Sequence, residues 1–334
     1  MIRIFKISLY LLFFAFVSQG FAQSDLKLIP IGDLKTVGGG TITQCKVGYR
    51  MLGRFNADKT NVILWPTWYT GTSSDVSKVI PSIVDTSRFA VIVVDALGNG
   101  VSSSPSNSTN FPAITIRDMV NSQRELLVNY FKIKHVYAIG GVSMGGMQTL
   151  EWLVTYPDFM DRAISIVGTP KQSFHDMLLW NTELELIKQA ERIGNPDEME
   201  QTGRRVADIQ FMELYTPAYF LRMYKGDDLQ SVLSKLYSEE HYNISDLRSQ
   251  LEAMINQNIY RTSGKSPDKI GEAIKSNLLV IVAVNDHMVN PQSSITLTKQ
   301  LNCKLELVGN DCGHNLLDCG SEQVRSAIAS FITL

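Results

Sequence analysis

Residues 141–145, with the sequence Gly-Val-Ser-Met-Gly, limit the fold of this chain more than any other segment. They follow the apolar run 136–139, which is typical of a buried strand, and they precede residues 147–154, which have the character of a helix that stops before Pro157. A serine in a G-x-S-x-G motif between a strand and a helix occupies a strained turn that exposes its hydroxyl. The amides that begin the following helix face an oxygen that becomes negative during acyl transfer. We therefore predict that Ser143 is a nucleophile.

The rest of the chain alternates between strand-like and helix-like segments. Continuous apolar runs predict further buried strands at residues 62–65, 90–94, 163–167, 278–284 and 305–308. Apolar residues at helical spacing and a closing helical pattern predict helices at residues 114–131, 291–301 and 321–332. Residues 36–55 alternate in short runs and predict one or two antiparallel edge strands. Because strands that alternate with helices build a mostly parallel sheet covered on both faces, we predict an α/β fold of that kind.

The stretch 171–271 breaks this alternation. It is helical in character, rich in charged and aromatic residues, and has no strand-like run. We predict a helical lid insertion over the carboxyl ends of the strands, where open α/β sheets bind ligands. Residues 23–170 and 272–334 then form the catalytic domain. Most of the aromatic side chains of the insertion are expected to form its own core and the others to line a pocket; they include Trp180, Phe211, Tyr215, Tyr219, Phe220 and Tyr224.

Residues 1–22 have the pattern of a secretory signal peptide. Arg3 and Lys6 precede an apolar stretch at residues 7–17, and residues 20–22 place small side chains at the two positions that signal peptidase reads. A membrane anchor is the alternative, but the apolar stretch is short for a span. We therefore expect cleavage, export to the periplasm or the medium, and no stable membrane anchor on the mature protein. The formal charge of −2 gives no indication of nucleic-acid binding.

All four cysteines lie in the predicted mature region, where an exported protein can oxidise them. Cys312 and Cys319 flank His314 and are candidates for a disulfide that staples its loop. The alternative, which is equally open, is that all four cysteines, including Cys45 and Cys303, are buried thiols without a disulfide. The spacing does not resemble a zinc site, so neither a metal nor a cofactor is expected.

A nucleophilic serine needs a base, and the base needs a carboxylate that orients it. Of the five histidines, His314 follows the last predicted strand and precedes the last predicted helix, where such a base belongs. Asp286 follows the strand at residues 278–284 and lies on the neighbouring loop. Asp311 is a rival acid, but it is on the same loop as His314 and only three residues away. The sequence favours Ser143, His314 and Asp286 as the catalytic set.

An oxyanion produced at the serine needs two backbone amides as donors. Met144, directly after the nucleophile, supplies one. The other is expected from the loop after the strand at residues 62–65, at Tyr69 or, as a second choice, at Trp68. The side chains of Trp68 and Tyr69 are candidates for lining the acyl pocket, with packing of their own loop as the alternative.

The chain resembles the homoserine O-acetyltransferase family of α/β-hydrolases. The matching segments are residues 53–56, 70–71, 115–120, 141–152, 156–158, 285–286 and 312–314. Residues 146–148 and 150–152 are more specific to this family than the G-x-S-x-G motif alone. The resemblance implies the α/β-hydrolase fold and the triad roles of Ser143, Asp286 and His314. It also implies an acetyl group that resides on the serine and then passes to an amino-acid hydroxyl.

Three features depart from the family. The histidine usual in the oxyanion loop is replaced around residues 66–68, and the arginine expected for the homoserine carboxylate aligns with Asp208, just after Arg204 and Arg205. Acetyl-CoA is not expected where an exported protein works. We therefore interpret the chain as an exported ester or amide hydrolase acting on a small molecule. The alternatives are an O-acyltransferase like the rest of the family and a non-catalytic binding protein on the same scaffold. The oligomeric state is open, with a homodimer as one option.

Overall fold

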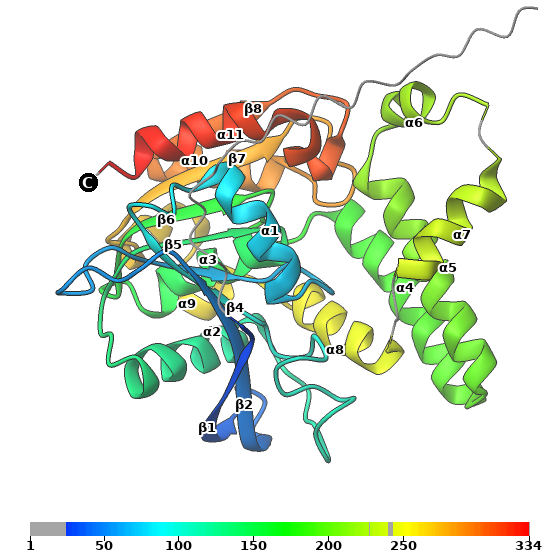
Figure 1. Cartoon of the computed structure of the whole chain (residues 1–334), viewed down its shortest axis with the longest axis horizontal. Helices are drawn as coiled ribbons and strands as arrows, with labels where there is room; N and C mark the ends of the chain where they lie inside the picture. Colours follow the sequence, from blue (N-terminus) through cyan, green and yellow to red (C-terminus); the bar gives the residue numbers. More distant parts are fainter. Residues whose placement is uncertain (1–24, 227, 240–242, 334) are drawn as a thin grey trace, which may run out of the picture.

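The computed structural model describes residues 25–226, 228–239 and 243–333, so the predicted signal peptide lies outside the described residues. Its strands form one sheet of eight, in the order β1-β2-β4-β3-β5-β6-β7-β8 (Figure 1). The strands are β1 Lys27–Lys35, β2 Thr41–Leu52, β3 Val62–Pro66, β4 Ala90–Val94, β5 Val136–Val142, β6 Met160–Ile166, β7 Asn277–Ala283 and β8 Lys304–Val308. The β1/β2 and β2/β4 pairs are antiparallel and all other pairs are parallel.

Helices cover both faces of this sheet. They are α1 Ser73–Ile83, α2 Ile116–Glu125 with the π-helical turn η1 Leu126–Tyr130, α3 Met144–Thr155, α10 Gln292–Leu301 and α11 Leu317–Phe331. Apolar side chains of α1 and α11 share one core with the sheet. Those of α2, α3 and α10 share another core on the opposite face. The predicted α/β class, with a mostly parallel sheet between two helical layers, is confirmed.

Several further helices lie between β6 and β7 in the chain. They are α4 Phe174–Ile193, α5 Pro196–Leu214, α6 Pro217–Met223, α7 Leu229–Glu239, α8 Ile244–Ile255, α9 Ile259–Ser263 and the 3₁₀ turn η2 Pro267–Ala273. Of these, α4 to α8 gather beyond one end of the sheet, while α9 lies beside α2 and α3 (Figure 1). Apolar residues of α4, α5 and α8 share a third core with Met144 and Met147 of α3 and with Leu97. The helical stretch therefore packs directly on the helix that follows Ser143. Its status as a separate lid stays a prediction.

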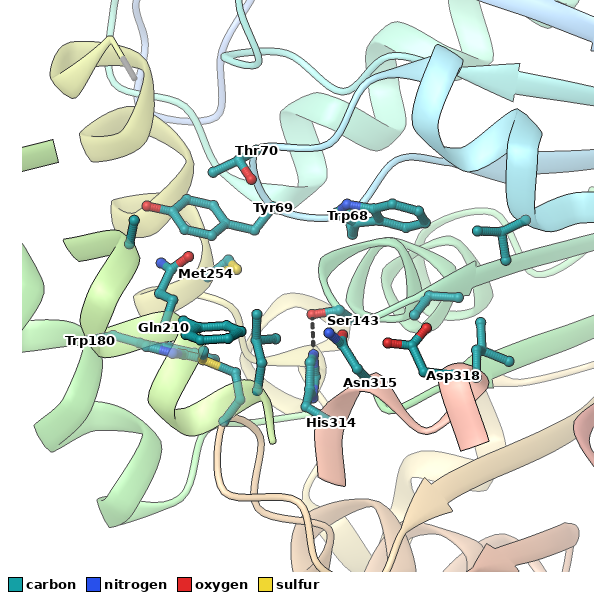
Figure 2. A pocket seen from close by; sticks show the side chains of 17 residues that line it. Trp68, Tyr69, Thr70, Ser143, Trp180, Gln210, Met254, His314, Asn315 and Asp318 are labelled. Atoms are coloured by element: carbon teal, nitrogen blue, oxygen red, sulfur yellow. Dashed lines mark hydrogen bonds between the residues drawn. The ribbon is translucent and has the colours of Figure 1, made fainter. Parts of the chain in front are cut away.

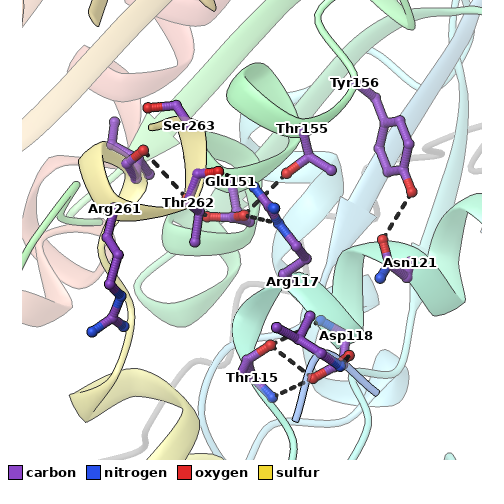
Figure 3. A network of polar contacts seen from close by, with 12 residues as sticks. Thr115, Arg117, Asp118, Asn121, Glu151, Thr155, Tyr156, Arg261, Thr262 and Ser263 are labelled. Carbon is purple, nitrogen blue, oxygen red and sulfur yellow. Dashed lines mark hydrogen bonds and ion pairs between the residues drawn. The ribbon is translucent and has the colours of Figure 1, made fainter. Parts of the chain in front are cut away.

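A partly buried ion pair, in which Glu151 is the buried partner, connects α9 to the sheet-covering helices (Figure 3). Arg117 of α2 donates from Nε to Glu151 of α3 over 2.7 Å and from Nη2 to the carbonyl of Thr262 over 3.0 Å. The Thr262 hydroxyl donates to the second Glu151 oxygen over 2.9 Å. Burial raises the pKa of Glu151, and Arg117 opposes that rise. Removing one partner of such a pair would leave an uncompensated buried charge, so the network fixes how α3 lies between its neighbours.

Two elements lie outside the sequence-based expectation. β1 precedes the predicted edge-strand segment, and a register irregularity falls between Pro30 and Gly32, which interrupt its alternation. α1 falls partly in a segment that reads as a polar loop. Thr72 begins this helix through a reciprocal capping box with Asp75, and Val76, Ile80 and Ile83 are the apolar residues of its buried face. Within the part of the chain that the structure describes, no helix combines the length and the apolar character that a membrane crossing requires.

Candidate active site

Ser143 lies on the turn between β5 and α3, as the motif predicts. Its backbone has φ +57° and ψ −121°, a costly conformation for a residue with a side chain. A Cβ on Gly141 would lie 2.3 Å from the carbonyl carbon of Gly145, and a Cβ on Gly145 would lie 2.6 Å from the Pro66 carbonyl oxygen. Both positions therefore need glycine, because the turn brings backbone against backbone.

The structure brings Ser143, His314 and Asp286 together in one hydrogen-bonded series. The Ser143 hydroxyl oxygen lies 2.8 Å from Nε2 of His314 (Figure 2), and Nδ1 of His314 lies 2.7 Å from Asp286 Oδ2. The other Asp286 oxygen accepts from the Val289 amide over 2.8 Å. His314 and Asp286 are buried, so the carboxylate and the imidazole are held away from bulk water. The arrangement can move a proton from the serine hydroxyl to the imidazole while the carboxylate orients the ring.

Two contacts fix the loop that carries His314, a disulfide and an ion pair. Cys312 and Cys319 form a disulfide with a Cα–Cα distance of 5.9 Å, which selects the staple over the four-thiol alternative. Asp311 points toward the helical stretch, where Arg222 of α6 donates to its two oxygens over 2.7 and 2.8 Å. This pairing lowers the pKa of Asp311. The rival carboxylate is thus engaged with Arg222, and the carboxylate on the imidazole is that of Asp286.

A cavity of about 350 Å³ opens at Ser143. In Figure 2 the serine lies between the side of Trp68 and Asp318 and the side of Trp180 and Gln210. Most of the lining is apolar: Val79, Val142, Trp180, Phe211, Leu214, Met254, Met288 and Leu317 contribute, together with the rings of Trp68 and Tyr69. Among the described residues that line the cavity there is no lysine and no arginine. The lining is therefore mainly apolar and offers no ammonium or guanidinium group to an anionic ligand.

The two expected oxyanion donors come from the helix after Ser143 and from the loop after β3. Met144 is the first residue of α3, so its amide is one of those that have no acceptor within the helix. Tyr69 lies on the loop that follows β3, and its ring lines the cavity. Gln148 of α3 connects the two elements, because its Nε2 donates to the Thr67 carbonyl over 3.0 Å and to the Met144 carbonyl over 3.2 Å.

The structure does not bring Asp208 to the cavity. Its carboxylate accepts from the Tyr237 hydroxyl, 2.7 Å from each oxygen, and Arg204 lies over the Tyr237 ring. Arg205 pairs with Glu198 over 2.7 Å. These contacts belong to the outer side of α5, while Ala207 and Gln210 of the same helix line the cavity. The expectation that Asp208 contacts substrate is therefore not supported by its position.

The six aromatic residues singled out in the helical stretch fall into two sets, and only Trp180 belongs to a buried core; the other five are half-buried. Trp180 and Phe211 line the cavity. The others form a cluster of ring contacts with Phe211: Tyr215, Tyr219, Phe220 and Tyr224. Gln210, Met254, Met288 and Asp318 also line the cavity but were not singled out from the sequence, because nothing local marks which face of a helix meets a distant loop.

Glu183 of α4 is a buried carboxyl behind the cavity wall. Its side chain is fully buried, and its Oε2 accepts from Nε2 of Gln210 over 3.3 Å. Burial raises the pKa of Glu183 to about 8; Gln210 opposes the rise and Glu213 adds to it. In the unfolded chain a glutamic acid titrates near pH ~4.3. Between these values unfolding releases a proton, so this group makes the folded state less stable as pH rises from 5 to 8.

We expect Glu183→Gln to remove that dependence. The variant cannot ionise, so its melting temperature should fall less than that of the wild type between pH 5 and pH 8. At pH 8 it should be more stable, by on the order of a few kcal/mol. Thermal unfolding of both proteins across this range is the measurement, with Glu185→Gln as the control because Glu185 is an exposed residue of the same helix. Parallel pH curves for wild type and Glu183→Gln would contradict the prediction.

Comparison with known proteins agrees with this geometry. The family model described as alpha/beta hydrolase fold matches residues 60–320. An ethyl acetate hydrolase of Pseudomonas veronii is 41% identical over 174 residues, which cover 49% of this chain and 50% of the relative. The chain thus spans about half the length of that curated relative. A homoserine O-acetyltransferase of Leptospira biflexa is 25% identical over 388 aligned positions, 95% of each chain.

Among solved structures, the acetyl esterase MekB superposes with a TM-score of 0.84 at 27% identity, covering 92% of this chain and 97% of that one. The resemblance to homoserine O-acetyltransferases that the motifs predict is confirmed, and esterases share the same overall structure.

Proposed function

Because the chain belongs to the α/β-hydrolase family of enzymes, we propose that it is a carboxylic ester hydrolase that works through an acyl-enzyme on Ser143. The observation that carries the proposal is the hydrogen-bonded series from Ser143 through His314 to Asp286 at the end of an apolar cavity. The ester hydrolase and the acetyl esterase among its relatives support the same reaction class.

The reaction proceeds in two halves. As the Ser143 oxygen attacks the ester carbonyl carbon, its proton passes to Nε2 of His314, and the carbonyl oxygen becomes an oxyanion. Collapse breaks the bond to the alcohol oxygen, which leaves with the proton from His314. Water then attacks the acyl-serine, His314 takes its proton, and the acid is released as the proton returns to Ser143. Asp286 accepts from Nδ1 throughout, so Nε2 is the nitrogen that takes up and returns the proton in each half.

The proposed oxyanion donors are the amides of Met144 and Tyr69. Charge develops on the oxygen only in the transition state, so donors fixed in advance lower the barrier without tightening the binding of substrate. The apolar lining favours uncharged acyl and alcohol groups. Amides of similar size are a second, slower class for the same machinery.

The runner-up is acyl transfer to an amino-acid hydroxyl, which the homoserine O-acetyltransferase relative favours. Such an acceptor carries a carboxylate, and no lysine or arginine is among the described residues that line the cavity. We therefore assign water as the acceptor. A non-catalytic role is set aside because the relatives are enzymes. Export remains a proposal, supported by the pattern of residues 1–22 and by a disulfide of the kind that persists in oxidising compartments.

Product analysis separates hydrolysis from transfer. The protein without residues 1–22 is incubated with p-nitrophenyl acetate, with and without 10 mM homoserine (about ten times a typical upper KM). We expect acetate as the product in both cases, with less than about a tenth of the acetyl groups on homoserine. O-acetylhomoserine as the main product would make the chain a transferase. Absence of any p-nitrophenol release above the background rate would overturn the ester hydrolase proposal.

A further inference from the structure

We propose that Gln250 of α8 is a positioning residue that holds the Tyr69 loop in place for the oxyanion. The inference rests on the proposed function and extends it, because it gives a helix between β6 and β7 a part in the chemical step. Gln250 neither lines the cavity nor touches Ser143, His314 or Asp286 among the contacts of the structure. It acts through the loop.

Gln250 bridges two loops of the sheet domain. It is buried, with 1% of its surface exposed. Its Oε1 accepts from the backbone amide of Thr70 over 2.9 Å, and its Nε2 donates to the carbonyl of Leu97 over 3.1 Å. A Cβ on Gly98 would lie 3.1 Å from Cγ of Gln250, so the side chain fits closely against the second loop. Both ends of the amide are thus used in connecting the loop after β3 to the loop after β4.

The peptide that Gln250 holds is a strained one. Thr70 has φ +63°, in the left-handed region, which is unusual for a β-branched residue. Such a conformation persists only where surrounding contacts fix it. Here α8 supplies them, because the Tyr69 hydroxyl also donates to the Leu247 carbonyl over 3.3 Å. Residues 69 and 70 are both held by the same face of one helix.

The other end of the loop is held from the sheet side. Gln148 donates to the Thr67 carbonyl over 3.0 Å, and the Thr67 hydroxyl accepts from the Ala96 amide over 3.0 Å. α8 itself is anchored, since Asp246 accepts from the amide and the hydroxyl of Ser106 over 2.9 and 2.5 Å. The Tyr69 amide therefore lies between an end fixed at Thr67 and a second end that Gln250 helps to hold at Thr70.

Losing Gln250 should move the donor without removing it. A displacement of about 1 Å can cost ~10²-fold in rate, and loss of an oxyanion donor costs ~10²–10³-fold. We expect Gln250→Met, which keeps length and burial, to lower kcat by roughly 10- to 100-fold. KM should change by less than about threefold, because the oxyanion forms only after substrate has bound.

The experiment compares Gln250→Met with Gln257→Met, using p-nitrophenyl acetate and active-site titration by a fluorophosphonate. Gln257 is a buried glutamine just beyond α8 whose amide has no partner among the described residues, and it is not part of the cavity. Affinity for 1,1,1-trifluoroacetone, whose adduct with a serine is tetrahedral, should fall in parallel with kcat for Gln250→Met and stay near wild type for Gln257→Met. A purely structural role of Gln250 would lower the titrated fraction and the melting temperature of Gln250→Met while kcat per titrated site and the affinity for trifluoroacetone stay near wild type.

If kcat per titrated site and trifluoroacetone affinity stay within twofold of the wild type, the positioning role is overturned while the esterase proposal stands. If the wild type neither hydrolyses the ester nor reacts with the fluorophosphonate, both proposals fall together. Should Gln250→Met not fold, Gln250→Glu retains an acceptor for Thr70 and loses the donor to Leu97. It carries the same test, with an expected kcat loss of at least about threefold.

Discussion

Ser143→Ala is expected to lower kcat for ester hydrolysis by about 10⁴- to 10⁶-fold while leaving the fold intact. The hydroxyl is the only group at the reactive end of the cavity that lies within hydrogen-bond distance of Nε2 of His314 in the described structure. Without it no acyl-enzyme forms, and only the residual effect of the oxyanion donors and of binding remains. Kinetics with p-nitrophenyl acetate and a circular dichroism melt measure the two parts of the prediction.

Ser122→Ala is the matched control. Ser122 is also buried and makes one hydrogen bond, to the Met119 carbonyl over 2.7 Å, but it lies on α2, away from the cavity. The kcat of Ser122→Ala should remain within about twofold of the wild-type value. Alanine at position 143 keeps the Cβ that strains the turn and loses only the hydroxyl, so the melting temperature should change little. Retention of more than about a hundredth of wild-type kcat in Ser143→Ala would mean that another group is the nucleophile.

Asp286→Asn is the second large effect, with an expected loss in kcat of about 10⁴-fold. An asparagine fits the same space, but it can present an N–H to the imidazole and favour the tautomer in which Nε2 carries the proton. His314 could then no longer accept from Ser143. The change should act mainly on kcat, because Asp286 is buried behind the histidine and does not line the cavity.

Asp311→Asn tests whether the effect is specific to one carboxylate. Asp311 is three residues from His314, and its side chain binds Arg222 at the edge of the site. We expect less than about a threefold change in kcat, together with lower stability if the Arg222 contact helps hold the loop. A larger kcat loss from Asp311→Asn than from Asp286→Asn would reverse the assignment that sequence order and geometry both favour.

The fold was largely predictable because its main elements are marked locally. Buried parallel strands are continuous apolar runs, and β3, β4 and β7 begin and end within a residue or two of the predicted bounds. The order of serine, aspartate and histidine along the chain placed Ser143, Asp286 and His314 at the ends of three different strands. The carboxyl ends of parallel strands lie along one edge of the sheet. The contact between Ser143 and His314, which are 171 residues apart, could therefore be predicted from local patterns.

What the sequence did not predict depends on partners that are distant in the chain. α1 was not predicted, because its capping residue Thr72 and the serines after it are also turn formers, although the Thr72/Asp75 capping box was a usable signal. No local sequence pattern singles out Gln250, because its proposed role depends on hydrogen bonds to Thr70 and Leu97, which are distant in the chain. Asp208 was placed at the site by alignment alone, and the turn of α5 that carries it faces Tyr237 instead.

The central claim is that the acyl group resides on Ser143, and covalent labelling tests it most directly. The wild-type protein is treated with a fluorophosphonate, digested, and analysed by mass spectrometry alongside Ser143→Ala. We predict one phosphonyl group per molecule, on the peptide that contains Ser143, with activity lost in proportion to labelling and no adduct in Ser143→Ala. An adduct on a different residue of the wild type, or undiminished stoichiometric labelling of Ser143→Ala, would contradict the account.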